Sequence, residues 1–368
     1  MAKTPSKLIE ITSRHQVYIE GHKTHISNKF GTFLQEMARS LDKRLLNKDL
    51  TKFSRDRLET LLKNVNNDLK DIYKEHYKVW REQIIDFADY EAGFEVKSLS
   101  QVVDNYDFKL PSRTQLRSAV FSSPLSGIKG PDKGKLLSSF YNGWTSKTIE
   151  LVEGTIRAGY YQGLTTPQIV RQIKGTSAQN FRDGQLARGN KDIEMLTRTA
   201  IQHAAGEARE ETWKNNSDIV KGIKIVVTLD DRTTAQCQSM DGLEFSVGEG
   251  PRPPFHIGCR STVVANLDER FSMLESGATR RARDPDNPRK VDFVPAKENY
   301  FEWLKQQTPE YQDSVIGPNR GKLLRDGGIS AKRFGELSLN KTTYKPLTLS
   351  EMKKNDVWAI AFEKANLN

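Results

Sequence analysis

The stretch that decides the fold runs from Gly222 to Thr262 and reads GIKIVVTLDDRTTAQCQSMDGLEFSVGEGPRPPFHIGCRST. Apolar and polar side chains alternate over residues 223–229, which is typical of a half-buried strand. Residues 243–247 alternate again, after a Met-Asp-Gly sequence in which Gly242 can take the positive φ of a tight turn. We therefore expect a small β-hairpin with a turn-rich excursion between its strands.

Both cysteines of the chain lie in this stretch. So small a β element buries little apolar surface, so other contacts must hold its closing loop. The spacing of Cys237, His256 and Cys259 is close to that of zinc ligands, and Asp230, Asp231 or water would complete the usual set of four. The alternatives are a disulfide between the cysteines, which an intracellular site disfavours, or two buried thiols beside a hydrogen-bonded His256.

The order of motifs is also informative: Asp-x-Arg-Thr, an apolar-Asp-Gly turn, then Pro-Pro-x-His-x-x-Cys-Arg. It resembles the phage head morphogenesis family, also called the Mu F-like minor head proteins. The matching residues are Asp230, Arg232, Thr233, Cys237, Asp241, Gly242, Pro253, Pro254, His256, Cys259 and Arg260. Thr234 and Ser261 depart from the pattern, because relatives carry cysteines at these positions. This departure weakens the metal interpretation.

The resemblance extends from residue 138 to residue 352 through further ordered blocks, at 149–163, 164–173, 193–200, 300–304, 317–328 and 344–352. It implies a structural minor capsid protein of a tailed bacteriophage, without enzymatic activity. Such a protein is bound near the portal inside the capsid and acts in head assembly and in DNA packaging or ejection. The implied partners are the portal protein, the major capsid protein and packaged DNA, with several copies per virion at the portal vertex after assembly in the host cytoplasm.

Composition fits a particle protein of this kind. The first twenty residues mix charges among short apolar runs, so a secretion signal is not expected. Mean hydropathy is −0.65 and no apolar window is long enough to cross a membrane, so a membrane partner is not expected either. The formal net charge of +10 favours an acidic partner such as DNA.

The densest basic run lies at residues 280–290, where two prolines and an asparagine predict a loop. An exposed loop of this charge can contact phosphate groups without reading sequence, although an ordinary exposed linker has the same composition. The DNA-contact candidates are Arg280, Arg281, Arg283, Arg289 and Lys290.

Two apolar stripes in the first hundred residues predict helices. The longer stripe repeats at spacings of three and four, and it comprises Leu58, Leu62, Val65, Leu69, Ile72, His76 and Val79. The shorter comprises Phe30, Phe33, Leu34, Met37, Leu41 and Leu45, so an antiparallel hairpin joined near residues 47–54 is the simplest arrangement. Core packing explains both stripes, and a coiled coil that binds a partner would also produce them.

These patterns predict a predominantly helical α+β fold with an N-terminal helical hairpin or coiled coil and a small β-hairpin. Prolines and glycines are dense between residues 108 and 134, which favours a boundary there. The expected division is an N-terminal helical docking region (1–107), a linker (108–137), the head morphogenesis domain (138–352) and a C-terminal tail (353–368).

A different class of function is a virion-carried metal-dependent nuclease or toxin-like enzyme. Asp230, Asp231 and Asp241 with His256 would supply its metal ligands and base. Aspartate at turn starts and before glycine is nevertheless expected from backbone chemistry alone, and neither cysteine has an activating third group. We therefore expect no catalytic residues, and no cofactor other than a structural zinc.

Overall fold

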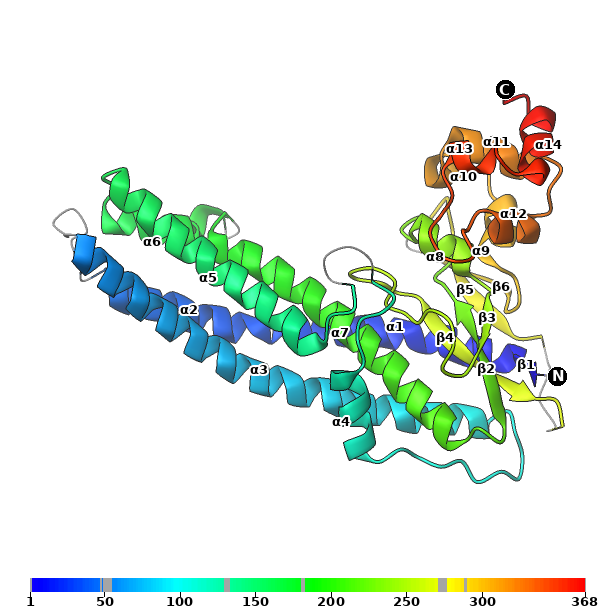
Figure 1. The fold of residues 1–368 in the computed structure, drawn as a ribbon, viewed down its shortest axis with the longest axis horizontal. Helices are drawn as coiled ribbons and strands as arrows, with labels where there is room; N and C mark the ends of the chain where they lie inside the picture. The colour runs from blue at the N-terminus through cyan, green and yellow to red at the C-terminus, as the bar shows by residue number, and fades with distance from the viewer. Residues whose placement is uncertain are drawn as a thin grey trace.

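The computed structural model describes residues 2–46, 48, 55–128, 133–179, 183–270, 277–287 and 290–367. Figure 1 shows an elongated molecule: long helices form one end, and a small sheet with a group of short helices forms the other. The fold is α+β and predominantly helical, as the sequence predicts. Among the described helices, none combines the length and apolar character that a membrane crossing requires.

The helical end contains the predicted hairpin. The helices of this end are α1 (Ser6–Asn28), α2 (Phe30–Leu45), α3 (Arg55–Ser100), α4 (Arg113–Ser122), α5 (Leu137–Tyr161), α6 (Thr166–Lys174), the short η2 (Ser177–Gln179) and α7 (Gln185–Asn215). The predicted hairpin consists of α2 and α3. The guanidinium of Arg44 on α2 donates two hydrogen bonds to Asp68 on α3, at 2.7 and 2.9 Å. The predicted connection at 47–54 lies outside the described residues, apart from Lys48.

The predicted stripe on α3 is buried except at its end. Val79 is 47% exposed and Trp80 is buried in its place. An α-helix repeats every 3.6 residues, so an alternation of three and four drifts off the buried face over several turns. The helix is also longer than its stripe, with 46 residues.

The sheet is antiparallel, in the order β1-β4-β2-β3. Its strands are β1 (Ala2–Lys3), β2 (Val220–Val226), β3 (Glu244–Ser246) and β4 (Thr262–Asp268). The predicted hairpin is β2 with β3, where Ile223 lies opposite Phe245. Two features were not expected: β4 pairs along the other side of β2, and the excursion between β2 and β3 contains the helix α8 (Ala235–Met240).

Beyond the sheet, β5 (Thr279–Arg283) pairs with β6 (Val291–Pro295). The prediction of a loop over 280–290 is therefore wrong for its first residues, because backbone pairing with β6 and burial of Ala282 make them a strand. Six short helices follow: α9 (Tyr300–Lys305), α10 (Pro309–Ile316), α11 (Pro318–Asp326), α12 (Ala331–Leu337), α13 (Leu349–Met352) and α14 (Asp356–Lys364).

The hydrophobic interior divides differently from the predicted domains. One core lies among the long helices, and the second surrounds the sheet and the C-terminal helices, while α3 and α7 contribute side chains to both. The predicted linker carries α4, whose Leu116 and Val120 are buried in the first core. The predicted tail contains α14, whose Trp358 is 0% exposed in the second. Prolines and glycines are dense around α4, but Leu116, Val120, Leu125 and Ile128 still pack inward.

A buried ionic network lies where α1, α3, α7 and β4 meet. Glu91 of α3 accepts hydrogen bonds from His15 of α1, at 2.7 Å, and from Arg209 of α7. The side chains of Glu91 and Arg209 are 0% and 1% exposed. Arg209 also donates to the carbonyl oxygen of Val263 on β4, at 3.1 Å. Burial raises the pKa of Glu91, but Arg209 and His15 outweigh it and hold this pKa below its ordinary value.

We predict that Glu91→Gln lowers the free energy of unfolding by about 3–5 kcal/mol, because it leaves the Arg209 charge buried without its closest carboxylate. Urea denaturation at neutral pH measures this loss. Since the folded-state pKa lies below the unfolded value, the difference between wild type and variant should shrink once the pH falls below about 4.

Glu75→Gln is the matched control, since Glu75 and Lys78 form an exposed ion pair. It should change stability by no more than about 0.5 kcal/mol. Equal effects of the two substitutions would show that the buried network does not hold the helices together.

Candidate metal centre and basic run

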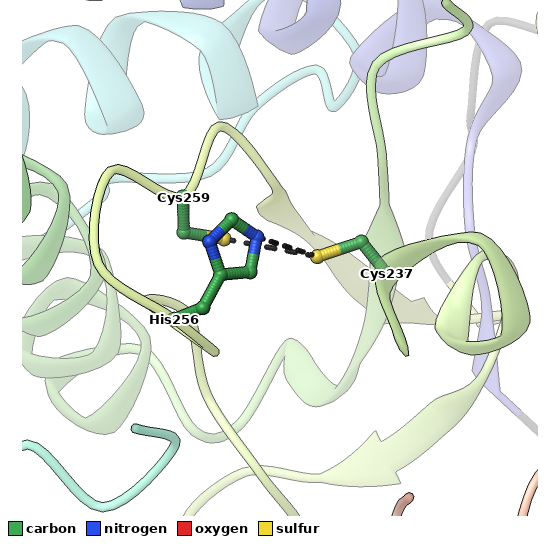
Figure 2. Close-up of side chains that lie close together, drawn as sticks. All are labelled: Cys237, His256 and Cys259. Carbon is green, nitrogen blue, oxygen red and sulfur yellow. Dashed lines mark hydrogen bonds between the residues drawn. The ribbon is translucent and has the colours of Figure 1, made fainter. Parts of the chain in front are cut away.

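The three candidate ligands come from two segments that face each other. Cys237 lies on α8, and His256 and Cys259 lie on the loop that leads into β4 (Figure 2). Thr234 begins α8 by accepting a hydrogen bond from the backbone N–H of Cys237. Lys23 of α1 donates to the carbonyl oxygen of Cys259 at 3.2 Å, which ties the loop to the helical end.

The geometry of this Cys-His-Cys cluster fits a tetrahedral metal ion at three corners. Cys237 Sγ lies 3.3 Å from His256 Nε2 and 4.0 Å from Cys259 Sγ. On a zinc ion, two sulfur ligands are about 3.8 Å apart and a sulfur and a nitrogen about 3.6 Å. His256 Nδ1 lies 2.9 Å from the carbonyl oxygen of Ile257, so a proton on Nδ1 leaves Nε2 free to bind a metal. The two cysteines are not joined in the alternative disulfide.

Electrostatics also suit metal ligation. Burial raises the pKa of Cys259, but hydrogen bonds with Cys237 and His256 outweigh it and hold this pKa well below its ordinary value. The hydrogen bond with Cys259 and burial raise the pKa of Cys237. Burial lowers the pKa of His256, but the Cys259 sulfur outweighs it and raises this pKa. The cluster therefore favours a thiolate at Cys259, which is the form that binds zinc.

The residues around the fourth corner carry hydroxyl groups. Thr234 and Ser261, the two positions that depart from the family pattern, line the same small cavity as Cys237 and His256. The expectation that Asp230 or Asp231 completes the ligand set is wrong. Arg260 holds Asp230 with two hydrogen bonds at 2.6 and 2.8 Å, and Asp231 pairs with Arg283. A water molecule or a hydroxyl group is the fourth ligand that this site offers.

The same geometry bears on catalysis. Asp241 accepts hydrogen bonds from the backbone N–H groups of Val227, at 2.9 Å, and Tyr300, at 2.8 Å. It serves the fold, as does Asp230. Cys259 is fully buried, which does not suit a nucleophile that must reach a substrate. In the described part of the chain, the Cys-His-Cys cluster is the one group of three or more histidine, cysteine, aspartate or glutamate side chains that lie close enough together to hold a metal ion.

The basic run splits into different roles. Arg280 is 3% exposed and donates hydrogen bonds to Asp241 and to two backbone carbonyl oxygens, so its prediction as a DNA contact is wrong. It lies on the inward face of β5 with Ala282, because side chains alternate along a strand. Arg289 lies outside the described residues. Arg281, Arg283 and Lys290 line one pocket, in which Arg283 pairs with Asp231 and Lys290 with Asp284.

Comparisons with protein-family models, curated proteins and solved structures found no match to this chain. The family resemblance therefore rests on the ordered residues of the sequence.

The fit of the three atoms leads us to expect about one zinc ion per chain in native protein purified without chelator. Elemental analysis measures this content. The His256→Ala variant should bind no zinc. Chelation should lower the melting temperature of the wild type, because the metal would no longer connect the loop to α8.

His25→Ala is the matched control, since His25 is an exposed histidine of α1. It should keep the full zinc content. If the native protein contains no metal and chelator does not change its melting temperature, hydrogen-bonded cysteines hold the loop without an ion.

Proposed function

We propose that this chain is a structural minor head protein of a tailed bacteriophage, bound near the portal inside the capsid. The observation that carries the proposal is the ordered set of residues from Asp230 to Arg260 that resembles the phage head morphogenesis family. Their contacts support it. Asp230 accepts a hydrogen bond from Arg260, and Asp241 accepts hydrogen bonds from the backbone N–H groups of Val227 and Tyr300. Cys237 Sγ lies 3.3 Å from His256 Nε2. A motif whose polar side chains are engaged in contacts within the protein serves the fold, which suits a structural protein.

The elongated shape suggests a division of labour between the two ends (Figure 1). The long helices dock on the portal or major capsid protein. Basic surfaces contact packaged DNA without sequence preference, because the chain carries a net charge of +10. Several copies assemble in the host cytoplasm and remain in the virion at the portal vertex, where they act in head assembly and in packaging or ejection.

The location has a direct test. Quantitative mass spectrometry of purified proheads and mature heads should detect the chain in a fixed ratio to the portal protein. Immunogold electron microscopy of opened heads, in which antibodies reach the capsid interior, should place it at one vertex. Absence of the chain from both particles would overturn the proposal. Equal labelling of all vertices would contradict its binding near the portal.

The DNA contact has a separate test. Retention of the purified protein on duplex DNA should fall steeply as salt rises, because each phosphate contact releases counterions. If retention on DNA does not change with salt concentration, the net positive charge serves solubility or protein contacts and does not bind DNA. Incubation with DNA and Mg²⁺, Mn²⁺ or Zn²⁺ should leave the DNA intact. Cleavage that His256→Ala abolishes, in a folded variant, would replace the structural role with the nuclease alternative.

A further inference from the structure

A pocket of about 300 Å³ lies between α1, the end of β2 and β5. Its apolar wall is aliphatic and consists of Val17, Val226, Val227, Leu229, Ala282 and Val291. Two of these side chains face solvent beside it, since Val17 is 50% exposed and Val291 is 37% exposed. The pocket therefore offers apolar surface that the described chain leaves uncovered.

The same pocket carries more positive charge than its carboxylates neutralise. Its six cations are Arg232, Arg260, Arg280, Arg281, Arg283 and Lys290. The carboxylates that pair with them are four: Asp230, Asp231, Asp241 and Asp284. Glu20 also lines the pocket, but it pairs with Lys23 and Arg198. Two cations are thus in excess.

Arg281 and Arg232 account for this excess. Within the described part of the chain, the side chain of Arg281 has neither a hydrogen bond nor an ion pair. Arg232 lies 3.8 Å from Asp230, a carboxylate that Arg260 already holds with two hydrogen bonds, and its side chain is 72% exposed. Both guanidinium groups are available for planar recognition of an anionic group.

The hairpin of β5 and β6 continues this surface. Arg281 lies opposite Phe293, and Arg283 lies opposite Val291. Residues directly opposite in an antiparallel pair share one face, so cations of β5 stand beside exposed apolar side chains of β6. Phe293 is among the most exposed large apolar residues of the chain. Arginines next to uncovered aromatic and aliphatic groups are typical of protein interfaces.

We propose that this pocket binds an acidic, partly apolar segment of a partner protein. Carboxylates of the segment contact Arg281 and Arg232, and its aliphatic side chains cover Val17 and Val291. A free inorganic anion would leave the apolar wall uncovered. Duplex DNA would do the same, since its backbone presents only phosphate and sugar. The inference is independent of the proposed phage role, because it concerns the purified chain and one class of ligand.

Fluorescence anisotropy with a labelled, amidated six-residue peptide of alternating Asp and Leu tests this proposal. The wild type should bind it saturably at one site. A peptide of alternating Asn and Leu, and one of alternating Asp and Ser, should each bind at least tenfold more weakly, since each lacks half of the recognised chemistry. Failure of saturable binding, or equal binding of the three peptides, would overturn the proposal.

Arg281→Glu should lower the affinity for the Asp-Leu peptide at least tenfold. Arg171→Glu is the matched control, because it makes the same charge change at an exposed position of α6 and should leave affinity unchanged. Val17→Asp supplies a second variant at an exposed site of α1, and it too should weaken binding. Equal affinities of the Arg281 and Arg171 variants would overturn the proposal.

A single-stranded and a duplex oligonucleotide complete the experiment as competitors. Neither should displace the peptide at concentrations that saturate nonspecific binding. Displacement by either one, with a parallel loss of oligonucleotide binding in Arg281→Glu, would overturn the proposal and assign the pocket to phosphate instead.

Discussion

The buried contact between Glu91 and Arg209 is the constraint on which the rest of the structure depends. Two charges removed from water are stable only when each meets the other in close geometry, so the crossing of α3 and α7 is fixed at this point. Arg209 also bonds Thr262 and Val263, which fixes the start of β4 against the helices. One guanidinium thus joins the helical core to the sheet.

The candidate metal centre depends on this junction. The loop with two of its ligands ends where β4 begins, and bonds from neighbouring helices hold it. Gln202 donates to the carbonyl oxygen of Ser261 at 2.8 Å, and Thr199 accepts from the N–H of Gly258 at 3.0 Å. Together with the hydrogen bond from Lys23 to Cys259, these contacts hold the loop in place against α1 and α7. A site pre-organised in this way loses little conformational entropy on ligation, which suits a structural role.

The basic run shows why net charge is a weak guide to a binding surface. Arg280 belongs to the run and Arg260 lies near it in space, yet both form ion pairs with aspartates that shape the fold. Two cations around this run exceed the carboxylates that pair with their neighbours, and both line a concave pocket with apolar walls. Its shape and chemistry favour a protein segment, whereas a composition argument alone favours DNA.

By itself the sequence determined the features that depend on neighbours along the chain. The stripes of α2 and α3, the pairing of β2 with β3 and the turn at Gly242, whose φ is +85°, follow from local periodicity and local backbone chemistry. Only the tertiary structure decided which polar residues are buried and which segments join the cores. Glu91 and Arg209 are 118 residues apart, and no periodicity encodes their pairing. Strand β5 depends on pairing with β6 and on the burial of Ala282, and α14 depends on a core built from distant parts of the sequence. In both cases packing between elements outweighs local propensity.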